Sequence, residues 1–132
     1  MGQEYRYTKT TVTLINYHFV FCPRYRRKVL IGDVDKRFRE ILQEICDEND
    51  LKIVALEVMP DHVHLFVNAP PSISPSDIMA KVKGVTSRKL RQEFKHLQHL
   101  PSLWTRSFFC STAGNVSSET IKRYIAEQKT RG

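Results

Sequence analysis

The sequence has no apolar run of membrane-spanning length and only three cysteines. No stretch approaches 18 apolar residues and the N-terminus shows no secretory signal pattern, so we expect a cytoplasmic protein without a membrane partner. Cys22, Cys46 and Cys110 are far apart and form no C-x-x-C pair. Their spacing favours reduced packing residues over a disulfide framework or a zinc site.

Acidic residues are also scarce, and nothing divides the chain. The 14 Asp and Glu residues are outnumbered by 21 Lys and Arg, which gives a net charge of +7 and favours a polyanionic partner. No linker, repeat or low-complexity segment interrupts the 132 residues, so residues 1–132 are expected to form a single domain.

The hydrophobic pattern predicts an α+β protein. Strands are expected at 12–21, 51–59, 62–69 and 103–112, long helices at 32–50 and from Pro75, capped by Ser74, to about 96, and a last helix at about 117–130. The order β-α-β-β-α-β is that of the ferredoxin-like, RRM-like split βαβ fold. We therefore expect an antiparallel sheet with two helices on one face, an open second face and an added C-terminal helix.

Two histidines, His62 and His64, share one face of the third predicted strand. Residues two apart on a strand lie roughly 6.6 Å apart and point the same way, which suits two nitrogens on one metal ion. Val63 and Leu65 would then enter the core, which places the histidines on the open face. An isolated pair of this kind is also compatible with half-buried surface residues. His18, on the neighbouring first strand, could share this face.

The terminal helix carries Tyr124 and Gln128 on one stripe, four residues apart. Ile121 and Ile125 form an adjacent stripe that we expect to dock the helix, and Ser117 is a candidate cap. A hydroxyl nucleophile and an amide oxygen are groups that a two-histidine metal site lacks.

Five segments resemble the single-tyrosine HUH transposases, which mobilise insertion sequences as single-stranded DNA. They are Pro23–Leu30, Met59–Leu65, Gly84–Arg91, Leu103–Phe109 and Ile121–Gln128. The resemblance runs from about residue 10 to 129 and makes the whole chain one HUH transposase domain. It implies that Tyr124 is the nucleophile, that His62 and His64 bind the metal, and that Gln128 is the third protein ligand. His18 is the alternative third ligand.

The resemblance also implies a reaction and partners. Tyr124 would form a covalent link to a 5′ phosphate and leave a free 3′ hydroxyl, with no nucleotide cofactor. Two imidazoles and an amide oxygen form a mixed site that could take Mg²⁺ or Mn²⁺. The expected ligand is single-stranded DNA with hairpin-forming ends. The expected assembly is a homodimer with composite sites in trans, served by the short Ala113-Gly114-Asn115 connection, in a prokaryotic, nucleoid-associated setting.

Basic residues that could contact DNA fall into two groups. The first follows the first strand and the second lies on the second long helix: Arg24, Tyr25, Arg26, Arg27 and Lys28, then Lys81, Lys83, Arg88 and Lys89. Cations neutralise phosphates, and an aromatic among arginines can stack on an unpaired base. A solvated surface is the alternative for any single member.

Several alternatives stay open. Within the catalytic class these are repeat-associated tyrosine transposases and other HUH endonucleases, such as rolling-circle initiators and relaxases. A non-catalytic ferredoxin-like nucleic-acid binder, with Phe66 and Tyr17 stacking bases, is the alternative of a different class. No general base is identified, because Asp61 is a candidate by proximity alone and a turn-forming role explains it better.

Overall fold

The computed structural model describes residues 5–112 and 118–132. Within these ranges the chain forms strands, α-helices and short 3₁₀ helices, labelled η. In chain order they are β1 (Arg6–Tyr7), β2 (Val12–Thr13), β3 (Asn16–Phe21), η1 (Arg24–Arg26), α1 (Gly32–Glu48), β4 (Lys52–Met59), β5 (His62–Asn68), α2 (Pro75–Glu93), η2 (Lys95–Leu97), β6 (Phe109–Ser111), α3 (Ser118–Glu127) and η3 (Gln128–Thr130).

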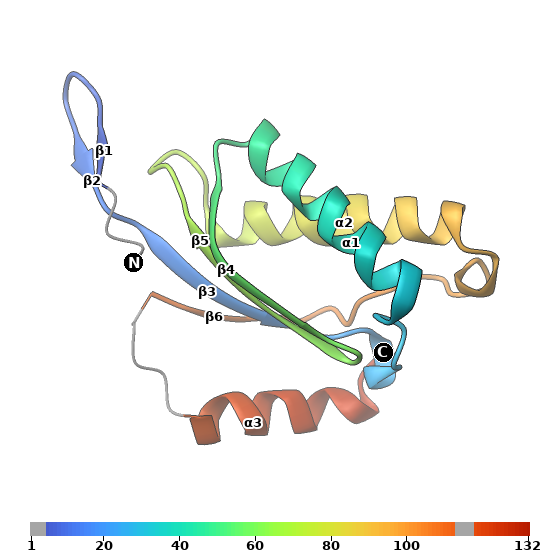
Figure 1. Ribbon diagram of the computed structural model, residues 1–132. Coiled ribbons are helices and arrows are strands. Elements are labelled where there is room, and N and C mark those ends of the chain that lie inside the picture. The colour runs from blue at the N-terminus through green and yellow to red at the C-terminus, as the bar shows by residue number, and fades with distance from the viewer. Residues whose placement is uncertain (1–4, 113–117) are drawn as a thin grey trace.

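The main sheet has four antiparallel strands in the order β4-β5-β3-β6 (Figure 1). Along the chain these are its second, third, first and fourth strands, which is the arrangement of the ferredoxin-like split βαβ unit. β3 and β5 are central, and their register sets His18 opposite Phe66 and Val20 opposite His64. The topology confirms the predicted fold.

The hydrophobic core lies between the sheet and the two long helices. Phe19, Phe21 and Leu65 point from the central strands into this layer and are fully buried, as strand alternation predicts. α1 and α2 close the layer with buried apolar side chains such as Phe38 and Ile78. α3 lies on the other side of the sheet (Figure 1).

The first strand is shorter than predicted. In place of one strand from 12 to 21, the chain has β2 at Val12–Thr13 and β3 at Asn16–Phe21. The reason is that β2 pairs with β1 in a separate two-stranded sheet, which the hydrophobic pattern did not indicate. The N-terminus therefore forms a hairpin outside the main sheet.

The fourth strand, predicted at 103–112, is confined to Phe109–Ser111. Upstream of it, the Trp104 indole is buried, with ring centroids 4.9 Å from Phe21 and 5.6 Å from Phe38. Trp104 still pairs with Pro23 in an isolated antiparallel bridge, so the predicted strand is interrupted at residues 105–108 and resumes as β6.

The helices follow their predicted limits closely. The Ser74 hydroxyl caps α2 by accepting a hydrogen bond from the Asp77 amide at 3.1 Å. α2 ends at Glu93 and a 3₁₀ turn follows, and α3 continues into η3. The predicted cap Ser117 and the connection 113–115 lie outside the described residues. Among the described helices, none has the length and apolar character of a membrane span.

Candidate active site

His62 and His64 both lie on the open face of β5, as their spacing predicts. Their ring centroids are 5.2 Å apart and the ring planes are inclined by 79°. Both side chains are half-buried, whereas Val63 and Leu65 are fully buried on the opposite face. The strand thus presents two neighbouring imidazoles while its other face anchors it in the core.

An ion pair positions His62. Its Nδ1 atom lies 2.8 Å from Asp61 Oδ1, and Asp61 Oδ2 accepts hydrogen bonds from Arg26 Nη2 at 2.7 Å and Nε at 3.1 Å. Burial alone would raise the pKa of Asp61, but the hydrogen bonds from His62 and Arg26 outweigh it and lower that pKa. A carboxylate on the second ring nitrogen is the usual support of a metal-binding histidine, because it fixes the orientation of the ring.

His18 contacts His64 on the same face. His18 Nε2 lies 3.2 Å from His64 Nδ1, and the His18 ring stacks on Phe66 with centroids 4.0 Å apart. Burial lowers the pKa of both histidines, so both are held neutral at pH 7. In the described part of the chain, no three His, Cys, Asp or Glu side chains are grouped to hold a metal ion.

Tyr124 and Gln128 are joined by Ser107. The Ser107 hydroxyl donates to Gln128 Oε1 at 2.9 Å and lies 3.0 Å from the Tyr124 hydroxyl. A serine has one proton to give, so Tyr124 donates to Ser107 in this arrangement. Gln128 is almost fully buried, and burial raises the pKa of Tyr124, with the Ser107 hydrogen bond opposing part of the rise.

Lys83 holds the chain that carries Ser107. Its Nζ donates to the carbonyl oxygens of Thr105 at 2.9 Å and Ser107 at 2.5 Å. Burial lowers the pKa of this ammonium to about 8. Its donors are directed to backbone carbonyls, which favours a structural role, and its contact with DNA stays a prediction.

A cavity of about 470 Å³ separates the histidines from the terminal helix. Arg26, His62 and His64 line one side, and α3 lines the other with Ile121, Lys122, Ile125 and Ala126.

The orientation of α3 differs from the one that we expected, in which Ile121 and Ile125 would dock the helix on the rest of the protein. Ile121 and Ile125 face the cavity, and Tyr124 with Gln128 docks on Ser107. Within one chain, the structure therefore does not bring these two residues onto the histidine pair.

The predicted DNA contacts are distributed over two regions. In η1, Arg26 belongs to the cavity, while Tyr25 is exposed and the Arg27 guanidinium lies 5.3 Å from its ring centroid. Arg24 is the first residue of η1, and Lys28 follows Arg27. On α2, across the sheet, Lys81 and Arg88 are exposed and Lys89 pairs with Glu44 at 3.6 Å.

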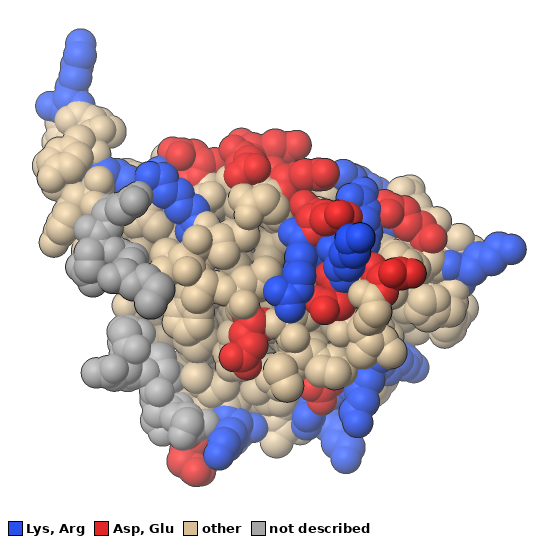
Figure 2. Space-filling view, viewed as in Figure 1, with Lys and Arg blue, Asp and Glu red and all other residues tan. Residues whose placement is uncertain are grey.

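Charge is unevenly distributed over the surface. Figure 2 shows many acidic side chains over α1, interspersed with basic ones, and further basic side chains at the tip of the N-terminal hairpin and near α3.

Two of these contacts could not be predicted from the sequence. Ser107 lies within the segment Leu103–Phe109, but no spacing or charge marks it as a partner of Tyr124. The link from Arg26 to Asp61 joins residues 35 positions apart. An Arg and an Asp in two separate turns give no pairing signal until the strand register is known.

Comparisons with known proteins identify the family. Residues 11–128 match the family model described as "Transposase IS200 like". The chain is similar to the ISDra2 transposase TnpA of Deinococcus radiodurans, with 32% identity over 117 residues that cover 86% of this chain and 84% of that protein.

Solved structures show the same likeness. A crystal structure of a Deinococcus radiodurans protein described as a transposase superposes with a TM-score of 0.87 and 32% identity, covering 93% of this chain and 97% of that one. The fold is also shared with a REP-associated tyrosine transposase solved bound to a REP hairpin, at a TM-score of 0.60 and 17% identity, covering 91% of this chain and 67% of that one.

Proposed function

Because this chain belongs to the IS200-like transposase family, we propose that it cleaves and rejoins single-stranded DNA at insertion-sequence ends. The observation that carries the proposal is the pair His62 and His64, with Asp61 hydrogen-bonded to His62, on a cavity that α3 lines from the other side. A carboxylate that orients one imidazole of such a pair favours a metal-binding site over a non-catalytic binding module.

Tyr124 is the proposed nucleophile. Its hydroxyl oxygen bonds to the scissile phosphorus, the bond from phosphorus to the 3′ oxygen breaks, the tyrosine gives up its proton, and the departing 3′ oxygen takes one up. The 5′-phosphotyrosine conserves the phosphodiester for rejoining, so no nucleotide cofactor is needed. A raised pKa makes an unassisted phenol a weak nucleophile at pH 7, so Tyr124 needs help from its surroundings.

The residues present fit a divalent metal, with Mg²⁺ or Mn²⁺ as the proposed ion. His62 and His64 offer their Nε2 atoms, because each Nδ1 atom already has a partner. Gln128 would supply the third donor through its side-chain carbonyl oxygen, once the helix that carries it is placed beside a histidine pair instead of on Ser107. When bound, such an ion positions a phosphate and stabilises its developing charge. Asp61 and Arg26 keep His62 correctly oriented for that role.

The proposed assembly is a homodimer with sites shared between subunits. Tyr124 and Gln128 dock on Ser107 of their own chain, whereas α3 turns Ile121 and Ile125 toward the histidines. Joining the nucleophile to the histidine pair thus requires another placement of a tyrosine helix, and a helix from a second subunit would meet this requirement.

Mixing two inactive variants tests this assembly. Subunits with His64→Ala are combined with subunits with Tyr124→Phe under conditions that exchange subunits. Composite sites predict that cleavage returns, with the covalent adduct on the His64→Ala chain. Failure to recover any adduct would support sites built within one chain.

DNA hairpins are the proposed recognition element. The basic segment Arg24–Lys28 borders the cavity, and Lys81, Arg88 and Lys89 offer further cations on α2. The shared fold with a transposase solved on a REP hairpin supports this choice and keeps a repeat-associated role as the second candidate. Imperfect palindromes in the DNA that flanks the gene would supply the test sequences and separate the two candidates.

Separation of binding from chemistry tests the proposed reaction. His62→Ala and His64→Ala should abolish cleavage of a single-stranded element end, yet leave hairpin affinity within about tenfold, or roughly 1.4 kcal/mol, because phosphate and base contacts carry the affinity. Arg27→Glu should instead weaken binding. Loss of binding in folded histidine variants, or equal cleavage of duplex DNA, would contradict the proposal.

A further inference from the structure

The hairpin of β1 and β2 projects from the body of the protein (Figure 1). Its strands set Arg6 opposite Thr13 and Tyr7 opposite Val12. The match to the transposase family begins at residue 11, so β1 and the turn precede the matched segment. The catalytic arrangement proposed above uses none of these residues.

The turn of this hairpin is well ordered by its own hydrogen bonds. The Thr8 amide donates to the Thr11 carbonyl at 2.9 Å, and the Thr11 amide donates to the Thr8 hydroxyl at 3.0 Å. The two hydroxyls lie 2.7 Å apart. Both ends of the turn are thereby fixed to each other, which gives the projecting segment a defined shape.

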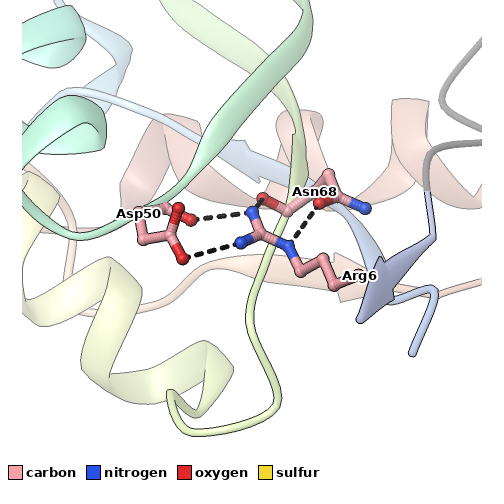
Figure 3. A network of polar contacts seen from close by, with 3 residues as sticks. All are labelled: Arg6, Asp50 and Asn68. Atoms are coloured by element: carbon pink, nitrogen blue, oxygen red, sulfur yellow. Dashed lines mark hydrogen bonds and ion pairs between the residues drawn. The ribbon is translucent and has the colours of Figure 1, made fainter. Parts of the chain in front are cut away.

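Arg6 clamps the hairpin to the body (Figure 3). Its Nε donates to Asn68 Oδ1 at 2.7 Å, its Nη1 to Asp50 Oδ2 at 2.8 Å, and its Nη2 to the Asp50 carbonyl at 2.7 Å. Asp50 has a positive φ of 55°, a backbone conformation that Asp tolerates better than most residues. A guanidinium with this many charge-assisted bonds fixes both the position and the direction of β1.

Because the Arg6 side chain points toward the body of the protein, the side chains of the adjacent hairpin residues point toward solvent. Side chains alternate along a strand, and Tyr5 and Tyr7 are accordingly 54% and 75% exposed, with Val12 at 60%. These are three of the seven large hydrophobic side chains exposed in the described residues. Lys9 is exposed at the turn, and residues 5–13 contain no Asp or Glu.

We propose that this hairpin is a stacking platform for unpaired bases of single-stranded DNA. Tyr5 and Tyr7 would stack on bases and Lys9 would neutralise a phosphate, which is the combination found in sequence-tolerant single-strand binding. The choice of DNA as ligand rests on the proposed function. Residues 5–13 of this hairpin contain Arg6, Lys9 and several threonines but no Asp or Glu. The hairpin therefore suits a polyanion better than a second copy of this basic chain.

The platform lies away from the proposed chemistry. Asn68, which anchors Arg6, is six residues along β5 from His62, or about 20 Å at roughly 3.3 Å per residue. Bases held there would belong to DNA several nucleotides from the scissile phosphate. The hairpin would thus add affinity for the strand without touching the reacting groups.

The experiment compares two matched double variants of the full chain. Binding to a fluorescently labelled 30-nucleotide oligo(dT) is measured by anisotropy in EDTA, which prevents cleavage. Tyr5→Ala with Tyr7→Ala should weaken binding at least about tenfold, because a base stacked on an aromatic contributes on the order of 1–3 kcal/mol. Tyr5→Phe with Tyr7→Phe keeps both rings and should bind like the parent protein.

Two further measurements identify the cause. A 5-bromouracil oligonucleotide should photocrosslink to Tyr5 or Tyr7, and a blunt duplex should bind the alanine variant as well as the parent. Unchanged oligo(dT) affinity, or equal loss on the duplex, overturns the proposal. So does an alanine variant whose subunit association falls while DNA binding is unchanged, because the tyrosines would then contact a second copy. The assay needs no cleavage, so a failed cleavage reaction would refute the proposed function alone.

Discussion

Replacement of Lys83 by methionine distinguishes an internal support from a DNA contact. The change removes the ammonium that donates to the Thr105 and Ser107 carbonyls, and it retains an apolar side chain of similar length. A hydrogen bond from a charged donor contributes about 1.5–3 kcal/mol to the free energy of unfolding. The variant also avoids the cost of keeping a poorly solvated charge inside the fold, which offsets part of the loss. We expect a net loss of about 2–4 kcal/mol in the free energy of unfolding.

Thermal unfolding measures this loss. For a chain of this length, each kcal/mol corresponds to a shift of very roughly 3–5 °C in Tm, so Tm should fall by about 10 °C. Lys81→Met is the matched control, because Lys81 is exposed on the same helix. Its Tm should stay close to that of the parent protein.

The salt dependence of hairpin binding gives the second readout. Each lost phosphate contact reduces the slope of log K against log salt by about 0.9 on a duplex stem. Lys83→Met should leave this slope unchanged, since its ammonium is engaged by carbonyls. A variant with an unchanged Tm and a slope reduced by about one contact would refute the internal role.

Three further predictions follow from buried groups. Thr86→Val should lower the free energy of unfolding by about 1–3 kcal/mol in chemical denaturation, because it leaves the Trp104 indole N–H, now 2.9 Å from the Thr86 hydroxyl, without an acceptor, whereas Thr86→Ser should restore it. Burial raises the pKa of the Cys46 thiol to about 12, so at pH 8 a thiol reagent should label Cys46 only as fast as the chain unfolds. Above about pH 9 the thiol ionises in the unfolded chain but not in the folded one, so the free energy of unfolding should fall as the pH rises. Asp61→Ala should weaken Mn²⁺ binding in calorimetry by about 10–100-fold through misorientation of His62, and an unchanged affinity would remove Asp61 from the site.

Strand alternation made the fold and the histidine face predictable. Val63 and Leu65 are apolar and must enter the core, so His62 and His64 had to share the other face whatever the register. The split βαβ order followed from the sequence of periodicities, because short antiparallel connections leave few topologies.

The docking face of the terminal helix was not predictable in the same way. Ile121 with Ile125 is the more apolar stripe, yet Tyr124 with Gln128 docks because Ser107 satisfies both polar groups. Such a choice depends on a hydrogen-bond partner that is distant in sequence and on the space available beside it. The burial of Lys83 has the same origin, since backbone carbonyls that attract an ammonium leave no mark in the sequence.

The site of covalent attachment tests the central claim most directly. The protein is incubated with Mg²⁺ or Mn²⁺ and a single-stranded element end, and the denaturant-resistant adduct is digested with nuclease and trypsin. Cleavage after Arg123 and Lys129 gives a peptide whose only hydroxyl-bearing side chain is Tyr124. Mass spectrometry should find the nucleotide on this peptide, and none should form with EDTA or with Tyr124→Phe. A nucleotide on any other peptide, or an adduct that persists in Tyr124→Phe, would contradict the account.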